Sequence, residues 1–191
     1  MKRTIQSMAI LVLAAMTFLA ACSKSSSPRP DDRPVPTTGT WEIAGQTYTK
    51  VQSTQDMQSP PGSGKDLVVI VITTSESANA HGAFSGSALT ISFPAGLGAG
   101  SYKLVTSADV SITKASKVMN ITCTLGTATT TGSTAYTTSS ELNGNAQLTI
   151  DDKGKYHISL KDPVTLKKQI DVNGGIDGAK ATYTLKFENL D

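Results

Sequence analysis

Few side chains of this 191-residue chain could act as nucleophiles or as ligands of a transition metal. The chain contains two cysteines, Cys22 and Cys123, and two histidines, His81 and His157. A catalytic thiolate needs an electropositive, accessible setting, and a zinc site needs about four ligands, so these groups favour neither kind of site. We assign no catalytic, metal-binding or cofactor-binding residue, and we expect that the protein is not an enzyme.

Three short motifs have part of a known chemical site but lack residues that the chemistry needs. Gly62–Lys65 resembles the end of a phosphate-binding loop, yet Asp66 stands where a serine or threonine is required. Ser111–Lys114 matches the S-x-x-K of penicillin-interacting serine enzymes, but the companion motifs are missing and we expect a strand there. Asp171–Gly178 alternates oxygen-bearing side chains as a calcium loop does, without the loop's glycine and final glutamate, so turn chemistry explains it.

The residues before Cys22 have the features of an export signal. Lys2 and Arg3 give a basic start, residues 8–19 are apolar, and two alanines precede the cysteine. This order defines a secretory signal peptide. The apolar stretch is shorter than the roughly 20 residues that a membrane-spanning helix needs. We therefore predict that residues 1–21 are a signal peptide.

The residues at the cleavage point favour lipidation over ordinary cleavage. Ordinary signal peptidase prefers a small residue at the third position before the cut, where this chain would place Leu19 or Phe18. Residues 19–22 (Leu-Ala-Ala-Cys) instead resemble the lipobox of bacterial lipoproteins. The resemblance implies lipidation of Cys22 with two or three acyl chains, enough for stable attachment to a membrane. Ser23 follows the cysteine where an aspartate would oppose export, so the same resemblance implies an outer-membrane anchor, with the domain on the periplasmic or cell-surface side.

Residues 22–38 are predicted to form a flexible tether. This segment contains four prolines and a run of serines, but no aromatic residue and only one aliphatic side chain, Val35. Such a composition keeps a chain extended and contributes little to a core. The folded part is therefore expected to be a single domain over residues 39–191, long enough to bury a core without disulfides or metal.

The mature protein is expected to carry no net charge. The 17 basic and 15 acidic residues of the precursor become 15 of each once Lys2 and Arg3 are removed with the signal peptide. A surface without net charge exerts no long-range attraction on nucleic acid. We therefore expect no nucleic-acid partner and attachment to the membrane through the lipid alone.

Alternation of apolar and polar residues indicates short β-strands throughout the domain. We predict a hairpin over residues 40–51 that turns at Ala44-Gly45, and a second hairpin over 146–160. Residues 52–64 and 126–134 are expected to be loops. Further strands are predicted over residues 66–74 (covered on both faces), 88–93, 101–105, 118–125, 164–170 and 181–187. About eight to ten short strands are typical of an antiparallel β-sandwich or a closed β-barrel.

Cys123 is predicted to lie in the core. It shares one face of its strand with Met119, Ile121 and Leu125. A lipidated Cys22 leaves it no disulfide partner, and a buried thiol packs as a small apolar group. His157 is expected on the outward face of its hairpin.

The opening of the domain resembles two families. It is similar to that of uncharacterised lipoproteins from Bacteroidota, which implies an all-β domain with no known catalytic residues. The residues that carry this likeness are Trp41, Ile43, Gly45, Tyr48, Gly100 and Tyr102. Gly39–Trp41 is also a G-x-W, which resembles the opening of the lipocalins and implies an eight-stranded barrel that carries a small ligand.

These features predict a membrane-anchored lipoprotein with a non-catalytic binding or structural role at the cell envelope. A protein, a glycan and a small molecule all remain open as its ligand. The alternative is a lipocalin-like carrier of a small apolar ligand. A filled core would favour the first function, and an apolar cavity of ligand size the second.

Overall fold

The computed structural model describes residues 39–59, 66–74, 86–112, 116–127, 132–142 and 144–191. All of them belong to one unit of the chain. The predictions for the signal peptide, Cys22 and the tether lie outside the described residues. So do those for the Gly62–Lys65 motif and for His81.

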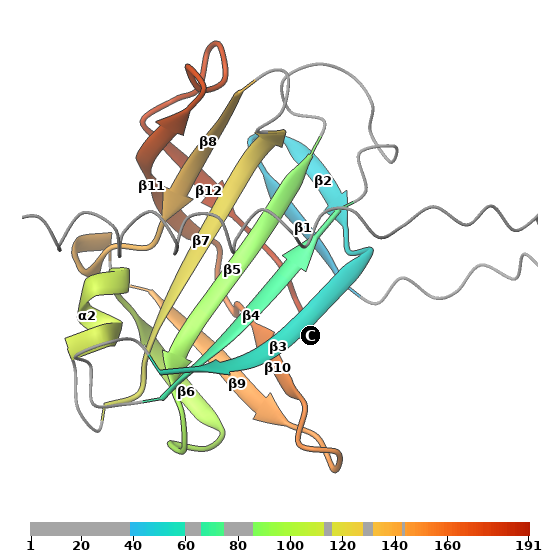
Figure 1. Ribbon diagram of the computed structural model, residues 1–191, viewed down its shortest axis with the longest axis vertical. Helices are drawn as coiled ribbons and strands as arrows, with labels where there is room; N and C mark the ends of the chain where they lie inside the picture. Colours follow the sequence, from blue (N-terminus) through green and yellow to red (C-terminus); the bar gives the residue numbers. More distant parts are fainter. Residues whose placement is uncertain (1–38, 60–65, 75–85, 113–115, 128–131, 143) are drawn as a thin grey trace, which may run out of the picture. The chain divides into compact units, whose positions relative to one another are not determined.

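The described residues form twelve strands and two short helical segments (Figure 1). The predicted all-β class is therefore confirmed, with more strands than expected. The strands are β1 (Thr40–Ile43), β2 (Gln46–Thr49), β3 (Gln52–Gln58), β4 (Leu67–Thr73), β5 (Ser87–Pro94), β6 (Gly100–Leu104), β7 (Val118–Thr127), β8 (Gly132–Thr137), β9 (Asn145–Ile150), β10 (Tyr156–Ser159), β11 (Val164–Val172) and β12 (Thr182–Leu185). The helical segments are α2 (Ser107–Ile112) and the 3₁₀ turn η2 (Ser140–Leu142).

Strand β7 joins two branches of one ten-stranded sheet. Its first residues, Val118 and Met119, pair with β6 in parallel, and its later residues pair antiparallel with β8. The main path runs β10-β9-β6-β7-β5-β4-β3, and the other branch continues from β8 to β11 and β12. All pairings other than β6–β7 are antiparallel, and the sheet is not closed, as in a sandwich.

A side chain bridges the two ends of the main path. The Gln55 amide on β3 donates from Nε2 to the carbonyl oxygen of Tyr156 on β10 at 2.9 Å. Its Oε1 accepts the Tyr156 N–H at 3.0 Å. The two edge strands are thus joined at this point by a side-chain amide in place of a main-chain ladder.

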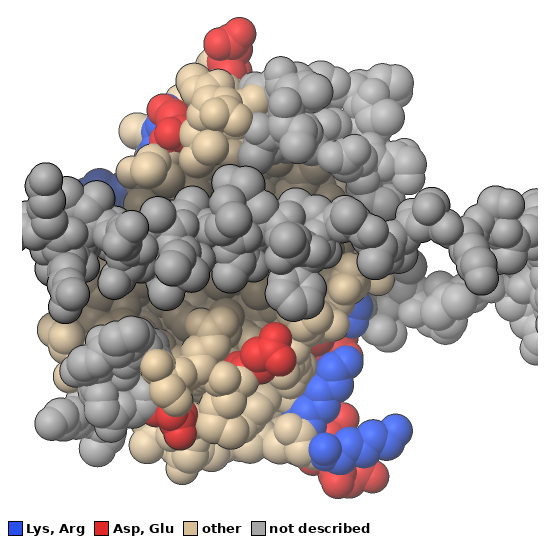
Figure 2. Space-filling model, viewed as in Figure 1, with Lys and Arg blue, Asp and Glu red and all other residues tan. Residues whose placement is uncertain are grey.

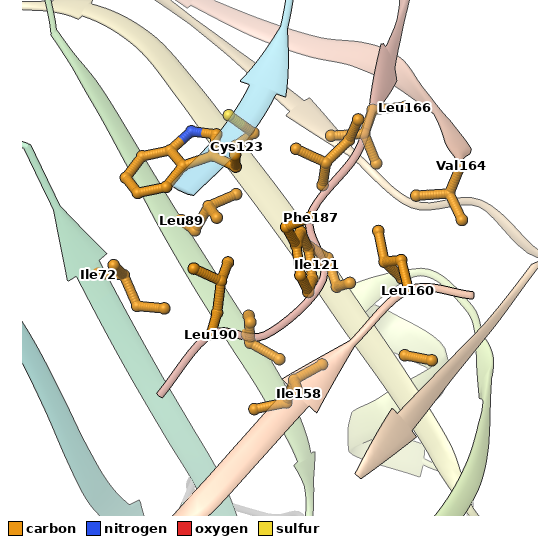
Figure 3. Close-up of a cluster of buried hydrophobic side chains, with 14 of the residues drawn as sticks. Ile72, Leu89, Ile121, Cys123, Ile158, Leu160, Val164, Leu166, Phe187 and Leu190 are labelled. Carbon is orange, nitrogen blue, oxygen red and sulfur yellow. The ribbon is translucent and has the colours of Figure 1, made fainter. Parts of the chain in front are cut away.

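The core lies along the inner faces of β4, β5 and β7, as the alternation of β5 and β7 predicted. Ile70, Ile91 and Ile121 sit opposite one another on the three strands and are fully buried. β-Branched side chains fill such cross-strand rows well. Figure 3 shows how side chains of other strands and of the C-terminal segment meet this face. The opposite face of β4 is only half-buried at Val69 and Val71, so the prediction that both faces are covered is only partly right.

Two predicted loops contain strands. Residues 52–58 form β3, which pairs with β4 along its whole length even though most of its side chains are exposed. An edge strand needs no apolar alternation, because main-chain bonds to its neighbour hold it. Residues 132–137 form β8, whose buried Ser133 and Thr134 are polar. Apolar alternation therefore does not predict either strand. Residues 128–131 of the second predicted loop lie outside the described part.

Ser111 and Ile112 lie in helix α2, so the strand expected at the S-x-x-K motif is wrong. Thr106 and Asp109 cap the helix: the Thr106 hydroxyl accepts the Asp109 N–H at 3.2 Å and donates to its carboxylate at 2.8 Å. Val110 is fully buried and packs in a small cluster with Leu67, Val105 and Val118. The cap and this one buried apolar side chain hold the helix in place. The helix is too short to show a helical period of apolar residues in the sequence.

Candidate functional site

A groove of about 540 Å³ lies between β1 and the C-terminal segment. One wall is β1, the second is the chain after β12, and the third is the loop between β10 and β11. The groove is lined by Gly39, Thr40, Trp41, Glu42, Leu160, Lys161, Pro163, Lys186, Phe187, Glu188 and Asn189. Its volume is in the range of small-ligand sites.

The apolar residues of the groove belong mainly to the core. Trp41 is 1% exposed, and Phe187 and Leu160 are also buried. Phe187 and Leu160 lie among the core side chains in Figure 3. The groove therefore offers a ligand main-chain atoms and charged side chains more than apolar surface.

Charges of both signs surround the groove. Glu42 on β1 and Lys186, the residue after β12, lie opposite each other and form an exposed ion pair at 3.5 Å. Lys161 and Glu188 have no ion-pair partner among the described residues. The site thus presents one unpaired cation and one unpaired anion to a ligand.

The C-terminal wall of the groove is firmly held. Leu190 is fully buried, and it exchanges two main-chain hydrogen bonds of 2.8 Å with Ile158 on β10. The Asp191 carboxylate pairs with Lys50 and, at 2.5 Å, with Lys155. Burial raises the pKa of Asp191, but the hydrogen bonds from Lys155 and Lys50 outweigh it and hold that pKa below its usual value.

Trp41 of the G-x-W lies beneath the groove. Its ring stacks on Tyr48 with the ring centres 5.8 Å apart. Its Nε1–H donates to the Ser87 hydroxyl at 3.0 Å, and that hydroxyl is 3.4 Å from the Cys123 sulfur. The type I′ geometry of the turn after β1, with positive φ at Ala44 and Gly45, places this strand as predicted.

Cys123 is fully buried, as its place in the alternation predicted. Burial raises the pKa of its thiol to about 12, with a smaller opposing effect of the hydrogen bond to Ser87. A thiol with this pKa has almost no thiolate at neutral pH, and the thiolate is the reactive form. The structure therefore gives Cys123 a packing role.

Cys123 in the native mature protein should resist N-ethylmaleimide at pH 7.5 and react fully in denaturant. Replacing it with alanine should lower the free energy of unfolding by about 1–2 kcal/mol, because only a sulfur atom leaves the core. Mass spectrometry of the labelled protein and urea unfolding measure the two effects. Rapid labelling of the native protein would contradict the buried register.

His157 is half-buried on β10 and lies 3.3 Å from the Asp151 carboxylate. Asp151 also accepts the main-chain N–H groups of Lys155 and Lys153. The bond from Lys155, with those from His157 and Lys153, holds the pKa of Asp151 below its usual value against the opposing effect of desolvation. The carboxylate is thus used to close the β9–β10 hairpin.

Asp171 lies on β11, two residues before Asn173, so the expectation that turn chemistry accounts for it is wrong at this position. Its carboxylate pairs with Lys168 at 2.7 Å and accepts the Thr134 hydroxyl at 2.7 Å. The bonds from Lys168 and Thr134 hold the pKa of Asp171 below its usual value. Within the described ranges, no three His, Cys, Asp or Glu side chains are grouped so that they could hold a metal ion.

A fragment of residues 39–191 should unfold cooperatively, with the same thermal midpoint in EDTA and in a thiol reductant. The reasons are its length, its single thiol and the use of Asp171 by protein donors. Differential scanning calorimetry tests this expectation. A fall of more than about 5 °C in the thermal midpoint in EDTA is equivalent to about 1–2 kcal/mol in a domain of this size. It would indicate that Asp171, Asn173 and Asp177 bind calcium.

No family model, curated protein or solved structure matches this chain. Among the described residues, no helix is long and apolar enough to cross a membrane. On the face shown in Figure 2, much of the described surface is uncharged, and acidic and basic side chains are mixed at its lower right. The groove was not foreseen from the sequence, because its walls come from residues more than a hundred positions apart and share no motif.

Proposed function

We propose that the protein is a lipoprotein of the outer membrane whose all-β domain binds a partner at the cell envelope without catalysis. The observation that carries the anchor is the run at residues 19–22, which ends in Cys22 after a basic and apolar leader. Acyl chains on that cysteine would bind the membrane, and residues 22–38 would allow the domain to reach a partner.

The groove beside β1 supports the binding part of the proposal. It combines main-chain atoms, charges of both signs and a firmly packed base. Large side chains from most strands fill the core, which supports a surface site over an internal apolar one. The paired histidine and the buried thiol are each occupied by structural partners, which supports a role without catalysis.

Replacing Cys22 with alanine should abolish incorporation of radiolabelled palmitate and leave the precursor uncleaved. The Cys123→Ala variant is the matched control, because it removes the other thiol and should incorporate palmitate normally. Autoradiography of the immunoprecipitated proteins, together with detergent phase partitioning, measures both effects. Label on the Cys22→Ala variant would overturn the proposed anchor.

A further inference from the structure

The groove lies where a β-ladder splits open. Glu42 and Lys186 exchange two main-chain hydrogen bonds, of 2.9 and 3.0 Å, between β1 and the residue after β12. If the antiparallel ladder continued, Thr40 would bond next with Glu188. The C-terminal chain instead turns toward β10, and the Phe187 carbonyl accepts the N–H of Leu160, the residue after β10, at 3.3 Å. The two strands therefore separate after one bonded pair.

The split leaves the main chain of Thr40 facing the groove. Gly39 bonds to Lys50 on the β2 side of the strand, and Glu42 bonds to Lys186 on the opposite side. Main-chain groups alternate sides along a strand, so the N–H and C=O of Thr40 point to the same side as those of Glu42. They have no main-chain partner among the described residues, and Thr40 lines the groove.

We propose that this groove binds an extended peptide segment of a partner protein, which adds to β1 beside Thr40. The peptide main chain forms hydrogen bonds with the Thr40 N–H and C=O, as in the addition of a strand to a sheet edge. Side chains of the peptide contact Lys161 and Glu188, the two unpaired charges of the rim, and so carry an acidic and a basic residue. This inference rests on the proposed binding function and names the class of its ligand.

The chemistry of the groove favours a peptide over the other ligands. Strand edges recognise main-chain amides, which a glycan lacks in regular spacing, and glycan sites present exposed aromatic rings. Trp41 and Phe187 are turned into the core instead. An apolar ligand would leave Lys161 and Glu188 desolvated without partners, which costs free energy.

The test uses peptides selected from a random dodecamer phage library on the full lipidated protein in detergent micelles. Thr40→Pro removes the main-chain donor together with the threonine side chain, and proline is tolerated at the first residue of a strand. Thr40→Ala is the matched control, because it keeps the donor and removes the side chain. We expect Thr40→Pro to weaken peptide binding at least tenfold and Thr40→Ala to change it less than twofold, measured by calorimetry.

A charge exchange provides a second variant should Thr40→Pro lower the thermal midpoint. The double variant Lys161→Glu/Glu188→Lys alters two exposed rim charges and leaves the net charge unchanged. It should weaken the selected peptides at least fivefold and recover affinity for peptides whose own charges are exchanged. Amide shifts in NMR spectra should change at Thr40, Glu188 and Asn189 when peptide is added.

Three outcomes overturn the inference. Peptides that bind Thr40→Pro and the charge-exchange variant as tightly as the parent do not use this groove. Selection of no peptide, with binding on an oligosaccharide array, assigns the groove or another surface to glycans and leaves the proposed binding function standing. Failure to bind either class overturns the inference as well, and restricts the proposed binding function to a small molecule or the surface of a folded protein.

Discussion

Replacing Trp41 with alanine should lower the free energy of unfolding by about 3–5 kcal/mol, the cost typical of removing a buried tryptophan. The indole is 1% exposed, stacks on Tyr48, and donates its N–H to Ser87. Its loss would leave a cavity beneath the groove and a buried hydroxyl without its donor. Because the chain has one tryptophan, the variant must be followed by far-ultraviolet circular dichroism in urea.

Trp41→Phe is the matched control for this expectation. It keeps an aromatic ring against Tyr48 but loses the donor to Ser87, so it should cost about 1–3 kcal/mol. Equal stabilities of the alanine variant and the parent would show that β1 does not close the core. They would also remove the packed base on which the groove depends.

Replacing Gly132 with alanine should lower the free energy of unfolding by at least about 3 kcal/mol, because two costs combine. Its φ is +73°, in the left-handed region. A Cβ atom there would lie 2.5 Å from the carbonyl oxygen of Gly175, 2.8 Å from that of Asn173 and 3.0 Å from that of Val172. All three are main-chain atoms, so β8 and the turn after β11 would have to separate.

Gly174→Ala separates the two costs. Gly174 has a φ of +87°, but a Cβ atom at this position would meet nothing within 4 Å. It should therefore cost only the conformational term, about 1–2 kcal/mol. Urea unfolding of both variants measures the difference. Similar losses for Gly132→Ala and Gly174→Ala would contradict the close approach of the β11–β12 turn to β8.

The strands that could be predicted are those whose side chains carry the pattern. Leu89, Ile91 and Phe93 alternate with residues of the other face, and the buried position of Cys123 follows from the same period. The turn at Ala44-Gly45 could be predicted as well, because a glycine beside a short residue favours the left-handed conformations of a tight hairpin.

The strands that could not be predicted are held by partners distant in the sequence. β3 is a polar edge strand fixed by its main-chain bonds to β4. β8 buries Thr134 because Asp171 accepts its hydroxyl and Ile176 donates an N–H to it. Polar residues satisfied in this way give no apolar period, so only the three-dimensional arrangement reveals them.

The two candidate sites differ in the same way: one could be predicted from the sequence, and the other could not. The predicted lipidation site is a local pattern, since the residues that define it, 19–22, are consecutive in the sequence. The groove is assembled from Thr40, Lys161 and Glu188, and it exists because the chain after Lys186 leaves β1 to pair with β10. A local pattern cannot show where two strands part.

The most direct test of the proposed lipoprotein is the mass of its mature N-terminal peptide. The protein should be purified from bacterial membranes, digested, and measured by mass spectrometry. We predict that the first peptide begins at Cys22 and carries a diacylglyceryl group, with or without a further acyl chain. A peptide that begins at Met1, or one that contains an unmodified Cys22 at any position, would contradict the account.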